Sequence, residues 1–282
     1  MYDLRTVTLG EPAGRRQGHY YGANTLTADE IAPHLRSRAF GREIYAFDSL
    51  ESTNLAARSL AGQGAGHGAL VIAEEQTSGR GRQGRTWIAE KGKNLTFSVI
   101  LRPRSRSASA GIIPLYAGLS VAEAIRPMIH RPPVCKWPND ILFGDKKVCG
   151  ILSESCLSPG EIAHVIVGIG INVNQTNFPP EIAGKATSLA SVSGGPLGRI
   201  EVLASILRSL ELWYEKVEAG DSPAILKSWM EYATMFGKPV RVNQEGRMIE
   251  GIALGLADDG GLLIQSDEKE IKILTGEIAH TV

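Results

Sequence analysis

The pattern of apolar and polar positions predicts that strands and helices alternate through most of this chain. Alternating or β-branched runs predict strands over 43–48, 69–74, 94–101, 134–137, 148–152 and 163–173. Helical composition and end signals predict helices over 27–37, 55–64, 110–129, 198–219 and 222–235. Beyond residue 235, short alternating segments separated by turns at 243–246 and 258–261 predict a small unit made only of strands.

This change of pattern predicts the domain organisation. We expect an α+β fold with a main domain over 23–235 and a small β domain over 236–282. The β unit is short for an independent fold, because a small domain buries little apolar surface, so we expect it to pack on the main domain. Residues 1–22 carry glycines and a proline among charges, which predicts an irregular N-terminal segment.

Composition narrows the class of protein. The 282 residues include 43% hydrophobic and 21% charged residues, which is typical of a globular protein. Lys+Arg and Asp+Glu number 30 each, and this balance argues against a general nucleic-acid binder. No apolar run is long enough to span a membrane, and no signal peptide is evident. Three cysteines in apolar surroundings (Cys135, Cys149, Cys156) predict buried, reduced thiols and a cytoplasmic protein.

The stretch GRGRQGRTW at 79–87 is the strongest candidate for chemistry. Three glycines free the backbone, and three arginines supply fixed positive charge that matches phosphates and carboxylates. The stretch contains the pattern G-x-G-x-x-G, but a strand rather than a helix is predicted after it, so a dinucleotide site is not favoured. We expect a mobile loop that folds over an anionic ligand. A solvated basic loop is the plain alternative.

Two further stretches combine polar groups at the ends of predicted elements. Ser52 or Thr53 can cap the helix over 55–64, and capping alone is the simpler interpretation, although a helix N-terminus also suits a polar ligand. VCKWPND at 134–140 offers a cation, an aromatic ring, an amide and a carboxylate. Asp140 fits either a simple turn or a site for Mg²⁺ with a nucleotide phosphate.

The run AHVIVGIGINV at 163–173 places Gly168 and Gly170 inside a predicted strand. Glycine weakens a strand, so a pair of glycines indicates that a ligand or another backbone approaches closely. Lys147 begins another apolar strand. A lysine there is ordinarily solvated, unless the strand leads into a site that binds a carboxylate.

Several of these motifs, taken in order, resemble the biotin protein ligases, also called biotin–acetyl-CoA-carboxylase ligases. They are DSLESTN at 48–54, EQTSGRGRQGRTW at 75–87, KWPND at 136–140, KKVCGILSE at 146–154 and VGIGINV at 167–173. The resemblance implies a mixed β-sheet catalytic domain flanked by helices, of the biotin/lipoate ligase type, and a small C-terminal SH3-like β-barrel. It also implies a form without the N-terminal DNA-binding domain that some members carry.

The implied reaction has two steps. Biotin and MgATP give biotinyl-5′-AMP and pyrophosphate, and the biotinyl group then passes to one lysine of a biotin carboxyl carrier protein. The cofactors are ATP and Mg²⁺, with Asp140 near the metal. The resemblance assigns catalysis to Lys147, Arg80 and Asp140. It assigns biotin binding to Ser52, Thr53, Asn54, Gln76, Gly79, Arg80, Gly81, Arg82, Lys147, Gly168 and Gly170. It assigns ATP binding to Arg82, Arg85, Trp87, Lys136, Asn139, Asp140 and Asn172.

Two other functions compete with this one. A lipoate–protein ligase would share the fold and the adenylating chemistry, and a biotin-sensing binding module would bind without turnover. The loop also departs from some family members, because Gln83 stands where they carry a basic residue. We expect no nucleic acid and no membrane as partner. Strand edges in this fold would allow a homodimer.

Overall fold

The computed structural model describes residues 26–104, 111–158, 161–244 and 246–281. The predicted irregular segment, 1–22, lies outside the described residues. One mixed sheet forms the centre of the fold, with the strand order β1-β2-β3-β7-β6-β5-β4. Only the β1–β2 pair is parallel. The strands of this sheet are β1 (Ile44–Leu50), β2 (Leu70–Gln76), β3 (Leu95–Leu101), β4 (Val134–Lys136), β5 (Asp140–Phe143), β6 (Lys146–Ser158) and β7 (Glu161–Ile171).

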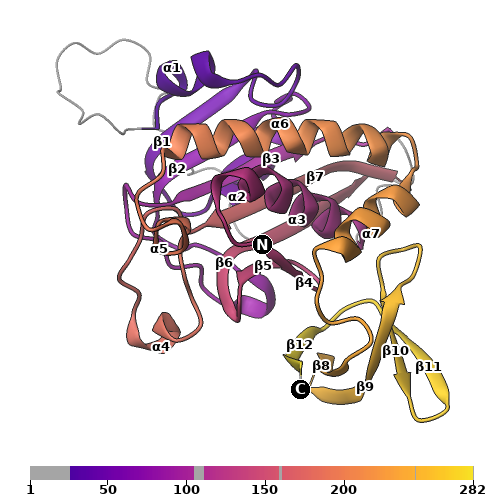
Figure 1. The fold of residues 1–282 in the computed structure, drawn as a ribbon. Coiled ribbons are helices and arrows are strands. Elements are labelled where there is room, and N and C mark those ends of the chain that lie inside the picture. Colours follow the sequence, from indigo (N-terminus) through magenta and orange to yellow (C-terminus); the bar gives the residue numbers. More distant parts are fainter. Residues whose placement is uncertain (1–25, 105–110, 159–160, 245, 282) are drawn as a thin grey trace.

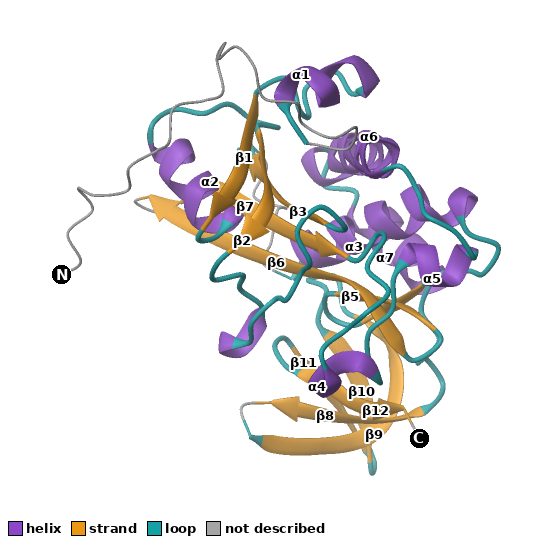
Figure 2. Cartoon of the chain, turned by 90° about the vertical axis from the view of Figure 1, so that its left-hand side faces the viewer, coloured by secondary structure: helices purple, strands orange, loops and turns teal. Residues whose placement is uncertain are grey.

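Helices cover both faces of this sheet (Figures 1 and 2). The helix α2 (Thr53–Gly62) lies on one face, and α3 (Ile112–Ile125), α6 (Arg199–Glu218) and α7 (Ser222–Glu231) lie on the other. The remaining helices are short: α1 (Ala28–Ile31), α4 (Pro180–Ala183) and α5 (Leu189–Ser193). None of the helices in the described part of the chain is long and apolar enough to cross a membrane.

The two faces of the sheet differ in composition, and this difference positions the site. On β3, Leu95, Phe97, Val99 and Leu101 enter the main core on the side of α3 and α6. Residues between them face α2, where Ile100 and Ile166 pack in a smaller apolar cluster with residues of that helix. Next to that cluster, Ser98 of β3 and Gly168 of β7 also face α2 and are partners in register. At these two positions the α2 face of the sheet has no apolar side chain.

The junction of β1 and α2 is held from a neighbouring strand. Ser52 occupies the N-cap position of α2, but its side chain makes no capping hydrogen bond. Instead, the Oε1 atom of Gln76, at the end of β2, accepts from the backbone N–H of Thr53 at 2.8 Å. A side-chain acceptor can satisfy an exposed N–H at a helix start from outside the helix. This contact joins two of the motifs that the sequence singled out.

A second sheet follows α7. It contains β8 (Pro239–Gln244), β9 (Arg247–Leu256), β10 (Leu262–Ser266), β11 (Lys269–Ile273) and β12 (Glu277–Thr281), all antiparallel, in the order β11-β10-β9-β8-β12. Its inward residues join the same hydrophobic core as the main sheet. The indole Nε1 of Trp137 donates to the Gly260 carbonyl at 3.1 Å. The expected fold class, a mixed sheet with helices and a small C-terminal β unit, is confirmed; the exact division at 235/236 stays a prediction.

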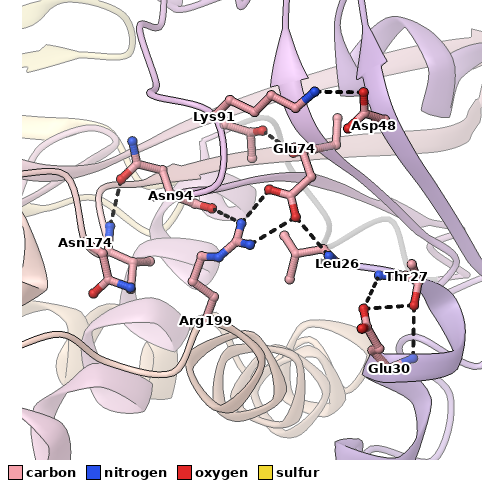
Figure 3. Close-up of polar contacts among 12 residues, drawn as sticks. Leu26, Thr27, Glu30, Asp48, Glu74, Lys91, Asn94, Asn174 and Arg199 are labelled. Carbon is pink, nitrogen blue, oxygen red and sulfur yellow. Dashed lines mark hydrogen bonds and ion pairs between the residues drawn. The ribbon is translucent and has the colours of Figure 1, made fainter. Parts of the chain in front are cut away.

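A buried ion pair fastens α6 to the sheet (Figure 3). Arg199, at the first turn of α6, pairs with Glu74 of β2 at 2.6 Å, and the two side chains are only 4% and 6% exposed. The Glu74 carboxylate also accepts from the backbone N–H of Leu26 at 2.8 Å. Glu74 therefore joins the start of the described chain, the edge region of the sheet and the longest helix.

Candidate active site

The glycine- and arginine-rich stretch forms a small hairpin. Trp87 N–H donates to the Gly79 carbonyl at 2.9 Å, Gly81 N–H donates to the Arg85 carbonyl at 2.7 Å, and Arg80 bridges Thr86. Its tip turns at Gln83 and Gly84, both with positive φ (55° and 73°). A Cβ atom on Gly79 would lie 2.5 Å from the Trp87 carbonyl oxygen, so only glycine fits where the hairpin closes. The segment at 79–87, which the sequence predicts to be a mobile loop, thus forms a hairpin in this structure.

Two arginines hold the hairpin against the end of the chain. The Arg82 guanidinium donates to the Asn139 side chain at 3.2 Å and to the Gly276 carbonyl at 3.3 Å. Arg85 donates to both carboxylate oxygens of Glu277, one at 2.7 Å. These hydrogen bonds hold the pKa of the Glu277 carboxyl below its ordinary value, because they favour its charged form. The C-terminal sheet therefore anchors the loop.

Arg80, which the resemblance assigns to catalysis, forms an ion pair at the surface. Its half-exposed side chain lies 3.8 Å from the more exposed carboxylate of Glu51. A pair of this kind contributes little to stability. Arg82 and Arg85, rather than Arg80, make the hydrogen bonds that fasten the hairpin to Asn139, Gly276 and Glu277. A catalytic role for Arg80 stays a prediction.

Lys147 lies beside a carboxylate and an aromatic ring. Its Nζ atom is 2.7 Å from Asp140 Oδ1 and 5.6 Å from the centre of the Trp87 ring. The backbone of Lys147 is fixed by hydrogen bonds to Lys185 and Thr187, so the start of β6 cannot shift freely. A cation over an indole face is also stabilised by the ring. The amino group therefore has a defined place, beside the cavity that Gly168 and Gly170 also line.

The strand glycines have close neighbours in this structure. A Cβ atom on Gly168 would lie 2.1 Å from Asn54 Oδ1, and one on Gly170 would lie 2.4 Å from the Trp87 indole. On the adjacent strand, a Cβ atom on Gly150 would lie 2.9 Å from the amino group of Lys147. The resemblance implies that Gly168 and Gly170 make room for biotin; in this structure they make room for Asn54 and Trp87. A role in biotin binding stays a prediction.

The predicted residues converge on adjoining cavities. A cavity of about 50 Å³ is lined by Ser52, Thr53, Asn54, Gln76, Arg80, Gly81, Arg82, Trp87, Asn139, Lys147, Gly168 and Gly170, among others. A neighbouring cavity of about 100 Å³ adds Arg85, Asp140 and Glu277. An open cleft of about 780 Å³ runs along the hairpin and includes Gly79. The residues that the resemblance assigns to biotin binding come from distant parts of the chain and thus lie close together around these cavities.

Two predicted ATP-binding residues line none of these three cavities. Asn172 is buried, and its side-chain amide donates to the Thr187 carbonyl at 3.0 Å. Lys136 lies at the end of β4, where its charge lowers the pKa of Glu277. Their contact with a nucleotide stays a prediction.

Comparison with known proteins identifies the family. The Biotin/lipoate A/B protein ligase family matches residues 46–172, and the Biotin protein ligase C terminal domain matches residues 235–281. The bifunctional ligase/repressor BirA of Bacillus subtilis is 35% identical over 280 residues, which cover 98% of this chain and 86% of that protein. The chain belongs to the biotin protein ligase family.

Two further relatives agree with this membership. The biotin–acetyl-CoA-carboxylase ligase of Mycobacterium tuberculosis is 32% identical over 235 residues, which cover 81% of this chain and 85% of that protein. The biotin protein ligase of Aquifex aeolicus, solved in complex with biotin and ATP, superimposes with a TM-score of 0.72 at 34% identity and covers 84% of this chain and 98% of that one. The family named from the sequence motifs is confirmed.

The site also contains residues that the sequence argument did not select. Gly150, Glu154, Ser98 and Glu277 all lie in or directly behind the cavities. Gly150 and Glu154 stand within the motif at 146–154, so the motif itself could have pointed to them. Ser98 is a polar residue at an inward position of an apolar strand, which is a usable signal. Glu277 comes from a distant part of the chain and gives no local sign.

The residues present are compatible with Mg²⁺ that arrives with a nucleotide. No cluster of three or more His, Cys, Asp or Glu side chains that could hold a metal occurs among the described residues. Asp140 does lie at the cavity, beside Lys147. Because Mg²⁺ is usually held by one or two protein carboxylates together with substrate phosphates, Asp140 suffices for such a site.

Proposed function

We propose that this protein activates biotin with MgATP to biotinyl-5′-AMP and pyrophosphate and then transfers biotin to a lysine of a carrier protein. The observation that carries the proposal is the position of Lys147, whose amino group lies where the polar cavity meets the arginine hairpin. Biotin offers a polar ureido head and a carboxylate tail. The cavity lining suits the head, and the fixed cations suit the tail and a phosphate.

In the first step, a carboxylate oxygen of biotin attacks the α-phosphorus of ATP. The bond between the α-phosphorus and the bridging oxygen breaks, and pyrophosphate leaves. Two anions must approach each other, so cations fixed in advance lower the barrier most effectively. We assign this part to Lys147, and we assign ATP binding to Arg82, Arg85, Trp87 and Asn139. Mg²⁺ held by Asp140 and the phosphates would neutralise charge on the leaving pyrophosphate.

In the second step, the carrier lysine amine attacks the biotinyl carbonyl carbon, an amide forms, and AMP leaves. The adenylate must survive until the carrier arrives, so water has to be kept away from it. The hairpin at 79–87 is suited to cover it, because Arg82 and Arg85 fasten it to Asn139, Gly276 and Glu277. We propose a biotin carboxyl carrier protein as the acceptor, in keeping with the names of the relatives.

A lipoate–protein ligase is the nearest rival, and the match to a C-terminal domain of biotin ligases favours biotin instead. ATP–pyrophosphate exchange tests the choice directly. Labelled pyrophosphate should enter ATP when biotin is present and should not do so when lipoate replaces it. Exchange that depends on lipoate alone would reverse the substrate assignment, and biotin binding without any exchange would indicate a sensor.

Two further expectations belong to this proposal. Each of the three cysteines is free, in keeping with a reducing cytoplasm, although Cys156 is only partly buried where we expected full burial. The sheet ends in β1 and β4. An edge strand offers unpaired backbone groups to a second copy, which supports a homodimer as a proposal. Sedimentation with and without biotin and ATP would test it.

A further inference from the structure

At the predicted biotin pocket, the side chain of Asn54, from α2, lies across three neighbouring strands of the sheet. Ser98 on β3, Gly168 on β7 and Leu152 on β6 lie in register on three neighbouring strands. Because Gly168 has no side chain, the amide of Asn54 can lie directly above it. Asn54 is only 4% exposed and reaches from Ser98 on one side to Leu152 and Glu154 on the other.

Two acceptors fix the orientation of the Asn54 amide. Its Nδ2 atom donates to a carboxylate oxygen of Glu154 at 2.7 Å and to the Leu152 carbonyl at 3.3 Å. Neither a carboxylate nor a carbonyl can donate, so the nitrogen must face them. The Oδ1 atom therefore faces Ser98, whose hydroxyl donates to it at 2.7 Å. Without the charged acceptor, only the longer contact to Leu152 would oppose a flip of the amide.

The same chain of hydrogen bonds continues into the pocket. Thr53 Oγ1 lies 2.9 Å from Ser98 Oγ and 3.0 Å from Gln76 Oε1. Because the one hydroxyl proton of Ser98 goes to Asn54, the contact between the two hydroxyls needs Thr53 as the donor. The Thr53 N–H donates to Gln76 Oε1 at 2.8 Å, so the Gln76 amide is oriented as well. Its Nε2 atom remains on the side of Gly79 and the cavity, as a hydrogen-bond donor.

We infer that Glu154 is a positioning residue for biotin, acting through Asn54 and Ser98 on Thr53 and Gln76. This inference rests on the proposed function, because it identifies the ligand of that pocket as a compound with a ureido head. Glu154 itself lies at the far end of the chain of hydrogen bonds, and its carboxylate is 27% exposed. Its partner on the outer side is Arg58, whose side chain is 49% exposed.

Removing the carboxylate should affect the biotin head and not the reacting groups. Hydrogen bonds to charged groups are among the stronger ones in proteins. Losing one that orients a buried amide should weaken binding of the ligand about tenfold. We expect Glu154→Ala to raise KM for biotin about tenfold, with KM for ATP and kcat of pyrophosphate exchange unchanged. Glu154→Gln keeps an acceptor and should stay within about threefold of the wild type. Arg58→Ala, the matched control, removes the exposed partner and should leave both KM values unchanged.

A reciprocal exchange of side chains separates positioning from direct contact. Asn54→Asp places two carboxylates against each other and should raise KM for biotin more than tenfold, roughly, since like charges in a buried site repel. Adding Glu154→Gln to Asn54→Asp restores a donor facing an acceptor and should bring KM for biotin back. If the double variant stays as poor as Asn54→Asp alone, the inference is wrong. Thermal unfolding confirms that each variant is folded.

The outcomes distinguish this inference from the proposed function. If the wild type shows no exchange that depends on biotin, the proposed function fails. If the wild type shows it and folded Glu154→Ala has the wild-type KM for biotin, only the positioning role fails. Equal increases of both KM values would indicate a general structural role of Glu154 and would also overturn the inference.

Discussion

Substitution of Lys147 by methionine tests the electrostatic argument most sharply. The change removes the ammonium group but keeps a flexible chain of similar length. In the structure this ammonium lies 2.7 Å from Asp140 Oδ1 and at the junction of the two small cavities. We expect the substitution to slow adenylate formation and to leave the fold in place.

The magnitude follows from the burial and the charge. A unit charge about 4 Å from a developing negative charge is worth about 4 kcal/mol at an effective dielectric constant near 20. That energy corresponds to a rate loss of about a thousandfold. Loss of the ion pair with Asp140 costs the fold far less, because the two side chains are 34% and 20% exposed; we expect about 1 kcal/mol.

The assay is biotin-dependent ATP–pyrophosphate exchange, with urea unfolding of the same samples. Lys146→Met is the matched control, because it removes the same charge at the next position, where the side chain is exposed. We expect kcat/KM to fall about a thousandfold for Lys147→Met and to remain near the wild-type value for Lys146→Met. Near-normal exchange by folded Lys147→Met, or an equal loss in both variants, would refute the reasoning.

Three further predictions concern the surroundings of the site. The hydrogen bonds that lower the pKa of Glu277 stabilise the fold while this carboxyl is ionised. The wild type should therefore unfold at higher urea than Glu277→Gln at about pH 6, and the difference should vanish as the pH falls through the lowered pKa; a constant difference would contradict this. Gly170→Ala should displace Trp87, because the new methyl group would lie 2.4 Å from the indole, and near-UV circular dichroism together with KM for ATP should change. Glu74→Gln removes the carboxylate that pairs with the buried Arg199 and should lower the free energy of unfolding by about 3 to 5 kcal/mol in urea titrations; a loss below about 1 kcal/mol would count against the importance of this pair.

Local pattern was sufficient for most of the fold. The alternation along β3 and β7 identified both strands, and the glycines at 168 and 170 marked the place where side chains from elsewhere approach closely. The motifs at 136–140 and 146–154 lie close together in sequence and form neighbouring strands, so their side chains meet as expected. Such contacts between adjacent elements follow from short-range information.

Contacts between distant segments could not be predicted in this way. Nothing near the hairpin indicates that Arg85 pairs with Glu277, because the two residues are 192 positions apart. The sequence also does not separate Arg80 from Arg82, which differ only in what the folded chain places beside them. The sequence also does not show that Asn54 and Trp87 fill the space beside Gly168 and Gly170, because this depends on how α2 and the hairpin pack on the sheet.

Transfer of biotin to a carrier protein tests the central claim most directly. A purified biotin carboxyl carrier protein, incubated with the ligase, biotin and MgATP, should gain the mass of one biotinyl group on a single lysine, as seen by mass spectrometry of the intact protein and its peptides. Lipoate in place of biotin should leave the carrier unchanged. A carrier that stays unmodified with biotin, or that is modified only with lipoate, would contradict the account.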